Sequence, residues 1–333
     1  MKRIAIIGIG GRTGTMFAFE LRDSADILGV GREPEIKLIE EKKLYIEKIN
    51  RAPELFQEKT ISDIEFQQQT APDIIFLTTK NPISNPIKYY YQDFKEKIPT
   101  LLISQNGIAA LSESKKALKE IFGERAEKVR VVRVILFNPI DKKYLKDKVV
   151  IKYTLPIRIV LAKSSGEEGI KDIVEVFRKA GIEVKEFPPE EAKDLEYSKL
   201  FLNIIGMAAA SREVSIKYGF KNKEIFKEEV GALKEYIKVV KLSGGKFLNF
   251  PHYPVKLLAT LFTWLPLTFL FPLRNMLAKI VSKGREGKPK DLDEIEYYNG
   301  AVVGLGEKIG FKTPLNEKIY QRALERLSAT RRN

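Results

Sequence analysis

The stretch RIAIIGIGGRTG, residues 3–14, decides the fold. The apolar run Arg3–Gly8 predicts a buried strand, and the pattern over Thr13–Leu21 predicts a helix. Between them lies the glycine-rich turn Gly8–Gly14. Without side chains, its backbone N–H groups can approach a pyrophosphate, and the helix N-terminus adds partial positive charge. The stretch therefore predicts the first unit of a dinucleotide-binding sheet.

The turn supplies the predicted phosphate contacts. Its spacing departs from GxGxxG, because Thr13 stands where the third glycine is expected and Gly14 follows one place later. A strand before the turn, a helix after it and a second strand about twenty residues on are the context that the motif requires. The predicted cofactor-binding residues of the turn are Gly8, Ile9, Gly10, Gly11, Arg12 and Thr13.

The second strand, Ala25–Gly31, indicates which dinucleotide binds. An acidic residue at its end would accept a hydrogen bond from the ribose 2′-OH of NAD. Arg32 occupies that position here, with Glu33 beside it. A guanidinium matches a 2′-phosphate in charge and in fork geometry, so the sequence predicts NADP(H) as the cofactor.

Two further loops follow predicted strands at their carboxyl ends, where ligands bind in parallel sheets. TTKNP follows Ile74–Thr79 and brings Lys80 toward the expected phosphate path. SQNG follows Thr100–Ser104 and carries Asn106. An asparagine before a glycine can merely form a turn, but the position favours a role in binding.

The order of elements predicts two domains. Apolar strands alternate with amphipathic helices, which favours a parallel sheet covered on both faces, and Val149–Ala162 resembles a β-hairpin. From Pro188 onward only helical periodicity remains. The predicted fold class is α/β, with a Rossmann-type parallel-sheet domain over residues 1–187 followed by an all-α domain over residues 188–333, which we expect to bind substrate and to dimerise.

Composition limits the chemistry. The chain has no cysteine and only His252 as histidine, so thiolate chemistry is excluded, no metal site is expected and proton transfer should fall to Lys, Glu, Asp or Tyr. The net charge of +14 comes from 58 basic and 44 acidic residues that are mixed along the chain, which disfavours a nucleic-acid groove. We expect a cytoplasmic protein and a homodimer.

The segment Leu257–Leu273 contains seventeen residues without charge. It is shorter than the roughly 20 residues that span a bilayer, and it contains Pro266 and Pro272. We predict a buried helical hairpin or a subunit interface. Peripheral contact with a membrane is the alternative.

The stretch EYSKLFLNII, residues 196–205, carries the candidate catalytic residue. Lys199 and Asn203 are four positions apart, so they share one face of a helix. Spacing alone favours a solvent-facing lysine. The surrounding sequence, however, resembles the ketopantoate reductase (2-dehydropantoate 2-reductase) family. The resemblance rests on the glycine turn, Arg32, Thr79–Lys80, Gln105–Gly107, YSKLFLN, and EIEYYNGAVVGLGEKIGFKTPLN at Glu294–Asn316.

The resemblance implies a fold and a set of roles. The fold would be a Rossmann domain followed by a helical domain, and the activity would be NADPH-dependent reduction of ketopantoate to pantoate. Lys199 would be the proton donor, Asn203 would bind substrate, and Asn106 would contact nicotinamide and substrate. Glu294 would be the second catalytic residue, facing the cofactor and the substrate pocket. Ser282, twelve residues before Glu294, is a candidate for binding the substrate carboxylate.

Departures from the family pattern keep alternatives open. Met207 stands where a second asparagine is frequent, Tyr197 replaces a tryptophan, and the segment from Ser282 to Glu294 fits poorly. A reductase of another, more apolar 2-keto acid is therefore one alternative. An NADP(H)-binding sensor without turnover is another.

Overall fold

The computed structural model describes residues 1–282 and 287–332, and the chain divides into two compact units. The first unit comprises Met1–Gln105 and Ala110–Ala192. The second comprises Asn106–Ala109 and the chain from Lys193 onward. Four residues of the N-terminal half thus belong to the C-terminal unit.

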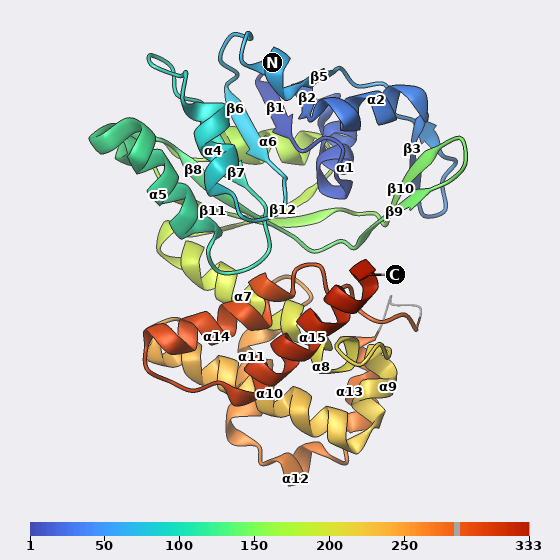
Figure 1. Ribbon diagram of the computed structural model, residues 1–333. Helices are drawn as coiled ribbons and strands as arrows, with labels where there is room; N and C mark the ends of the chain where they lie inside the picture. The colour runs from blue at the N-terminus through green and yellow to red at the C-terminus, as the bar shows by residue number, and fades with distance from the viewer. Residues whose placement is uncertain (283–286, 333) are drawn as a thin grey trace. The chain divides into compact units, whose positions relative to one another are not determined.

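The first unit is built on an eight-stranded sheet with the order β12-β11-β8-β7-β6-β1-β2-β5 (Figure 1). Neighbours from β5 to β8 in this order run parallel, whereas β11 is antiparallel to β8. The predicted Rossmann-type sheet is confirmed. Its strands are β1 (Arg3–Ile7), β2 (Asp26–Gly31), β5 (Thr60–Ser62), β6 (Ile74–Leu77), β7 (Thr100–Ile103), β8 (Val131–Leu136), β11 (Arg158–Ser165) and β12 (Glu183–Phe187).

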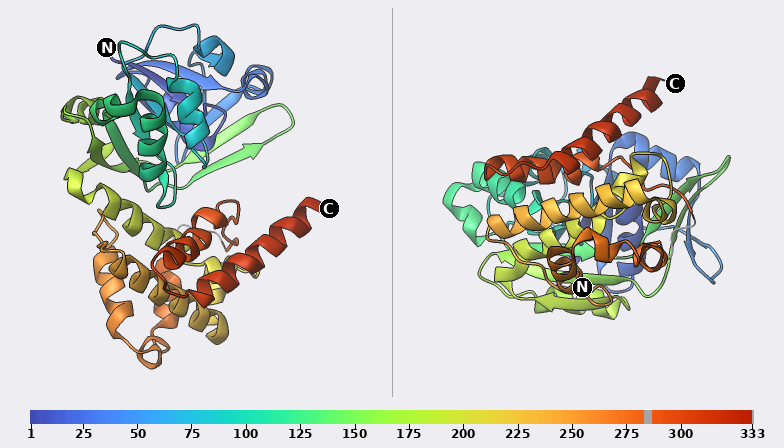
Figure 2. Two further views of the ribbon diagram at one scale, coloured as in Figure 1. Left: turned by 60° about the vertical axis from the view of Figure 1, so that its left-hand side comes forward. Right: turned by 90° about the horizontal axis from the view of Figure 1, so that it is seen from below.

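A second, four-stranded sheet has the order β4-β3-β10-β9. Its strands are β3 (Leu44–Lys48), β4 (Glu54–Leu55), β9 (Ile140–Tyr144) and β10 (Val149–Tyr153). The predicted hairpin over Val149–Ala162 is wrong, because β10 pairs with β3 and β9 while β11 joins the large sheet. Both runs are apolar, so the pattern could not tell their partners apart. The true hairpin is β9–β10, which extends beyond the large sheet (Figures 1 and 2).

Helices cover the large sheet and close its core. Phe17 of α1 contacts Phe76 of β6 with ring centroids 4.8 Å apart, and Phe177 of α6 packs edge-on against both rings. Such tilted and edge-to-face contacts are the favoured geometries of aromatic pairs. The helices of this unit are α1 (Arg12–Leu21), α2 (Glu33–Glu41), α3 (Asp63–Phe66), α4 (Ser84–Tyr91), α5 (Ala110–Phe122), η1 (Gly123–Lys128), α6 (Lys171–Lys179) and η2 (Pro189–Glu191).

The described part of the second unit is helical and is organised around α10 (Lys223–Leu242). Asn222 caps this helix by accepting the N–H groups of Glu224 and Ile225 at 3.0 and 3.1 Å. Helices α14 and α15 lie side by side against it (Figure 2). The other helices are α7 (Ala192–Ile204), α8 (Met207–Ala210), α9 (Ile216–Lys221), α11 (Val255–Trp264), α12 (Leu267–Leu270), α13 (Arg274–Val281), η3 (Ile295–Tyr297), α14 (Asn299–Lys308) and α15 (Pro314–Arg332).

The apolar segment Leu257–Leu273 is helical, but it is not the buried hairpin that we predicted. Trp264 is 78% exposed and Phe269 65%, while only one side of α11 packs inward through Val255, Ala259 and Phe262. The prediction failed because the segment carries more apolar residues than the helical core covers. No helix in the described ranges is long and apolar enough to cross a membrane.

Candidate active site

The glycine turn after β1 is held by backbone bonds that leave the start of α1 open. Gly8 has a φ of +93°, and the N–H groups of Gly8 and Ile9 donate to the carbonyl of Val30 at 2.8 and 3.0 Å. Thr15 ties the turn to α1 by donating its hydroxyl to Ile9 at 2.7 Å and Gly11 at 2.8 Å. Gly11 and Arg12 are exposed. The first N–H groups of a helix lack intrahelical partners, so this end suits an anion.

Gly14 performs the packing role expected of the third glycine in the motif. A Cβ atom on Gly14 would lie 2.4 Å from the Gly8 carbonyl oxygen and 2.7 Å from the Thr78 hydroxyl. Helix α1 can approach the turn and β6 this closely only without a side chain there. The irregular spacing noted in the sequence therefore does not loosen the turn.

Arg32 lies at the end of β2 as predicted, but its guanidinium is already engaged. Its Nε and Nη2 atoms donate to Oε1 of Glu35 at 3.1 and 2.5 Å, and its backbone N–H donates to Oε2 at 3.2 Å. These contacts raise the pKa of Arg32 above its ordinary value. The carboxylate is close to the turn, because a Cβ atom on Gly10 would lie 3.1 Å from the carboxylate carbon, Cδ, of Glu35. A cation and an anion thus lie together at the end of β2.

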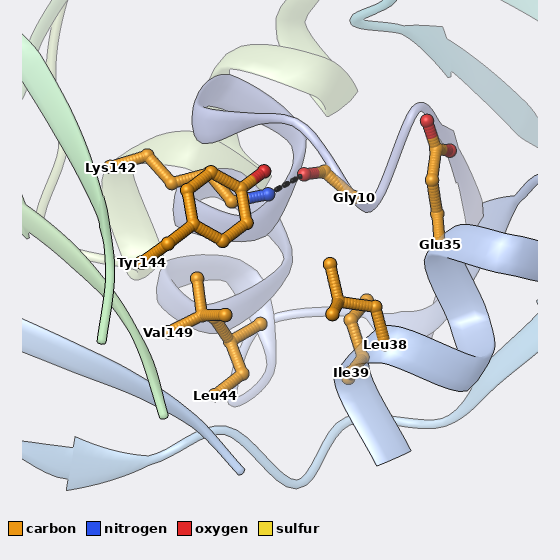
Figure 3. Close-up of a pocket in the computed structure, with 8 residues that line it drawn as sticks. All are labelled: Gly10, Glu35, Leu38, Ile39, Leu44, Lys142, Tyr144 and Val149. Carbon is orange, nitrogen blue, oxygen red and sulfur yellow. Dashed lines mark hydrogen bonds between the residues drawn. The ribbon is translucent and has the colours of Figure 1, made fainter. Parts of the chain in front are cut away.

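A second cation reaches the turn from the small sheet. Lys142 of β9 donates from Nζ to the Gly10 carbonyl at 2.6 Å, as Figure 3 shows. The surrounding pocket measures about 80 Å³, which is too small for a dinucleotide. Sequence reasoning missed Lys142, because several lysines surround it in IDKKYLKDK and nothing marks one of them as close to Gly10. The residues that line this pocket are Gly10, Glu35, Leu38, Ile39, Leu44, Lys142, Tyr144 and Val149.

Polar atoms without partners lie beyond the ends of β6 and β7. The hydroxyl of Thr79 and Oε1 of Gln105 are buried and accept no hydrogen bond from any described residue. Gln105 is oriented by its amide, which donates to Leu77 and Thr79 at 2.9 and 3.0 Å. Lys80 follows as an exposed residue. A glycine cradle beside buried polar atoms that lack partners fits a dinucleotide, which would satisfy such groups.

A buried arginine that sequence reasoning missed supports this strand end. Arg133 of β8 is completely buried and donates to the Ile103 carbonyl at 3.0 Å and to the Gln105 carbonyl. It thereby fixes the backbone immediately before Asn106. In the sequence it looked like one polar residue in an apolar strand, so nothing distinguished it from a residue at a sheet edge.

In the second unit, α7 carries Lys199 and Asn203 one turn apart and both half-buried, so they share one helix face as predicted. The helix ends at Ile204, and the chain turns at Gly206, where φ is +91° and a Cβ atom would lie 2.6 Å from Ile216. Met207, where an asparagine would have supplied a polar contact, is completely buried among apolar residues.

Asn106 is the centre of a hydrogen-bonded group. Its amide donates to Oε2 of Glu294 at 2.9 Å, and its Oδ1 accepts from the Asn203 amide at 3.2 Å. The hydroxyl of Tyr298 also donates to Oε2 of Glu294, at 2.9 Å. Three of the residues predicted from separate motifs are therefore in direct contact. Tyr298 was not singled out, although it lies in the quoted EIEYYNG.

Two residues of opposite charge, Lys290 and Glu229, form hydrogen bonds with the backbone at the end of α7. Lys290 donates from Nζ to the carbonyls of Asn203 and, at 3.1 Å, of Ile205. Glu229 accepts the N–H groups of Gly206 at 2.5 Å and Ala208 at 3.0 Å, and burial raises its pKa to about 7. Both residues were missed, since each lies far along the chain from α7.

Ser282 lies outside this group. Its hydroxyl donates to the Ala278 carbonyl of the preceding helix, α13, at 2.6 Å. The next residues, 283–286, lie outside the described part of the chain, so the poorly fitting segment after Ser282 is described only from residue 287. Among the described residues, no three His, Asp or Glu side chains gather as metal ligands would.

Known proteins share the fold described above. The large parallel sheet and the glycine turn define a Rossmann-type dinucleotide-binding fold. Residues 4–137 match the family model described as "Ketopantoate reductase PanE/ApbA", so this part of the chain is a domain of that family, and the resemblance read from the sequence is confirmed. No curated protein matches the chain by sequence.

Solved structures extend the fold over nearly the whole chain. A PanE/ApbA family ketopantoate reductase from Ralstonia eutropha JMP134 has a TM-score of 0.73 at 14% identity, covering 96% of this chain and 97% of that one. D-mandelate dehydrogenase with NADH and anilino(oxo)acetate has a TM-score of 0.70 at 17% identity, covering 98% of each chain. A 2-dehydropantoate 2-reductase from Geobacter metallireducens GS-15 has a TM-score of 0.67 at 18% identity, covering 97% and 99%. At these identities the likeness shows the fold alone.

Proposed function

We propose that the protein reduces a 2-keto acid to a 2-hydroxy acid with NADPH, and that ketopantoate, reduced to pantoate, is the leading substrate. The observation that carries the proposal is the group formed by Asn106, Asn203 and Glu294, with Lys199 one helical turn before Asn203. These residues come from three distant stretches of sequence. Local backbone structure, such as a helix end or a turn, does not require these side chains to be in contact.

Each residue has a chemical role in this proposal. Negative charge develops on the carbonyl oxygen during reduction, and the ammonium of Lys199 stabilises it and donates the proton. The amides of Asn106 and Asn203 can donate to the carboxylate and the carbonyl of the substrate. Glu294 holds the Asn106 amide in place. The nicotinamide, when bound, supplies the hydride.

The cofactor proposal rests on the first unit. The turn from Gly8 to Thr13 would hold the pyrophosphate, with Lys80 and Lys142 as nearby cations. Arg32 would bind the 2′-phosphate of NADPH by releasing Glu35. The printed description of D-mandelate dehydrogenase names NADH instead. The Arg32–Glu35 pair is therefore the feature on which the preference between NADPH and NADH depends.

A second substrate class is supported by Met207. This residue is completely buried, so it offers no polar contact to a hydroxylated keto acid. D-mandelate dehydrogenase, whose printed ligand is the aromatic keto acid derivative anilino(oxo)acetate, has the same fold. A more apolar 2-keto acid is accordingly the second candidate substrate.

The deciding experiment follows NADPH absorbance with ketopantoate and a panel of apolar and aromatic 2-keto acids. We expect oxidation of NADPH with at least one of them, and loss of turnover in Lys199→Ala. Lys193→Ala, an exposed lysine of α7, is the matched control and should retain activity. NADPH binding without oxidation by any substrate would favour the sensor without turnover. Full turnover in Lys199→Ala would refute the proton-donor role.

The remaining proposals concern the setting of the enzyme. We propose a homodimer, and the fold neighbours include a dimeric ketopantoate reductase from Staphylococcus aureus. We also propose a cytoplasmic location, where NADPH and keto acids are available. Sedimentation velocity and cell fractionation test the two proposals separately.

A further inference from the structure

Helices α11, α12 and α13 of the second unit expose an unusual amount of apolar surface, which we name the α11–α13 surface. Trp264 is 78% exposed, Phe269 65% and Ile280 63%. Single exposed apolar residues are ordinary, but several of them on three consecutive helices indicate an interaction site. The exposed apolar side chains that define the surface are Leu257, Leu261, Trp264, Phe269, Met276 and Ile280.

The spacing of these residues shows that α11 is apolar on two sides. Val255, Ala259 and Phe262 pack inward, as the core-facing side of an amphipathic helix should. Leu257, Leu261 and Trp264 recur at intervals of four and three residues, which brings them onto one face. That face is exposed, so it has no partner in the described part of the chain. Helix α12 lies at one end of the unit, at the bottom of Figure 1.

The charged side chains within this segment have one sign. Residues 251–282 contain Lys256, Arg274 and Lys279 and neither aspartate nor glutamate. Two lysines of α10 add to it: Lys234 donates to the Leu265 carbonyl at 2.8 Å, and Lys241 to the Thr263 hydroxyl at 3.3 Å. In a chain with 44 acidic residues, a segment of this length without any is an electrostatic feature. It fits an anionic partner.

We propose that the α11–α13 surface binds peripherally to an anionic lipid bilayer. Tryptophan and phenylalanine insert at the boundary between headgroups and acyl chains, while flanking lysines contact anionic headgroups. The long stems of Lys256 and Lys279 can lie along the apolar surface with their ammonium groups at the headgroups. The second-copy alternative is weaker, because a two-fold interface through this surface would bring cations together without acids from the same segment to pair them.

The protein contains one tryptophan, Trp264, so its fluorescence reports on this surface alone. We expect vesicles of phosphatidylcholine with phosphatidylglycerol to shift the emission to shorter wavelength, and brominated acyl chains to quench it. Vesicles of phosphatidylcholine alone should have little effect, and high salt should reverse the shift. Unchanged emission with anionic vesicles would overturn the proposal. No turnover is involved, so the result is independent of the proposed reaction.

Variants separate lipid binding from self-association. Trp264→Ser with Phe269→Ser, and separately Lys256→Gln with Lys279→Gln, should each weaken co-sedimentation with anionic vesicles about tenfold or more. Ile64→Ser is the matched control, because Ile64 is 62% exposed on the first unit, and it should bind like the parent protein. Circular dichroism checks that each variant is folded. If the lipid-free protein is a dimer that the Trp264→Ser and Phe269→Ser pair dissociates, the surface joins two copies and the lipid proposal is refuted.

Discussion

The amide of Asn106 donates to the carboxylate of Glu294 at 2.9 Å, across 188 positions of the chain. Glu294 accepts a second bond from Tyr298 on the same oxygen, and Asn106 accepts one from Asn203. The carboxylate therefore fixes which way the amide points, and with it the donors and acceptors that a keto acid would meet. The arrangement leads to the first of four predictions.

Glu294→Leu should lower kcat/KM for the keto acid about tenfold to a hundredfold. The substitution removes the acceptor of the Asn106 amide, and an unsatisfied polar group costs about 1–3 kcal/mol. Steady-state kinetics under saturating NADPH measure the effect. Glu296→Leu, an exposed neighbour in η3, is the control and should change kcat/KM less than twofold. Equal values for the two variants would contradict the role of Glu294.

Glu35→Gln should strengthen NADPH binding relative to NADH. Glu35 holds Arg32 through its charge and two guanidinium contacts, and a neutral amide competes less well with a 2′-phosphate. Isothermal titration should show a shift in the NADPH to NADH affinity ratio of about tenfold.

Glu33→Gln provides the control for that shift. Glu33 lies on the same first turn of α2 but pairs with Lys37 at 2.8 Å, so its neutralisation should leave the ratio unchanged. Because glutamine can still accept the Arg32 N–H, Glu35→Gln should preserve the start of α2. An unaltered ratio in Glu35→Gln would mean that Arg32 does not read the 2′ position.

Gly14→Ala should both destabilise the protein and weaken dinucleotide binding. The added Cβ atom would lie 2.4 Å from the Gly8 carbonyl oxygen, so α1 or the turn must move. Overpacking of this kind costs about 1–3 kcal/mol. Urea unfolding and NADPH titration measure the two effects. Gly169→Ala is the control, because nothing lies within 4 Å of its Cβ position. Normal affinity in Gly14→Ala would show that the close packing is not needed.

The contribution of Glu229 to the free energy of unfolding should fall as the pH rises. Burial raises its pKa from 4.5 to about 7, so the folded state favours the protonated carboxyl more than the unfolded state does. Its contribution is complete below pH 4.5 and is lost as the pH passes through about 7, by about 3 kcal/mol. Urea unfolding at several pH values, comparing the parent protein with Glu229→Gln, isolates this dependence.

Glu224→Gln is the control for that comparison, since it removes an exposed carboxylate from the same helix. Its free energy of unfolding should follow the pH dependence of the parent protein. A difference between the parent protein and Glu229→Gln that stays constant from pH 4.5 to 7 would contradict the shifted pKa.

The sequence was sufficient for the sheet because its strands are continuous apolar runs, such as Ile74–Leu77, that only a doubly covered parallel sheet buries completely. The sequence was also sufficient to predict that Arg32 lies at the end of β2, because the end of a strand determines the position of the next residue. The sequence was insufficient for the pairing of strands over Val149–Ala162, where the chain passes from the small sheet to the large one. The runs β10 and β11 are equally apolar, and nothing local shows that they belong to different sheets.

Most of the residues that were missed are far in the sequence from the groups that they contact. Four charged residues were missed because only the folded chain brings them into place. Lys142 reaches the glycine turn, Arg133 the end of β7, and Lys290 and Glu229 the end of α7. Glu35 was missed although its contact with Arg32 is local, because the two residues are three positions apart on the first turn of α2. The segment Leu257–Leu273 was misjudged for the opposite reason, since composition reports apolar character and not the number of neighbours available to cover it.

The assignment of Asn106–Ala109 to the second unit has a consequence for biosynthesis. Asn106 leaves the ribosome 97 residues before Asn203 and 188 before Glu294. Asn106 is therefore synthesised before either of its partners, and translation that stops before Glu294 gives a product in which the Asn106 amide lacks this carboxylate. No single proteolytic cut between residues 110 and 192 would release the helical unit with all of its parts.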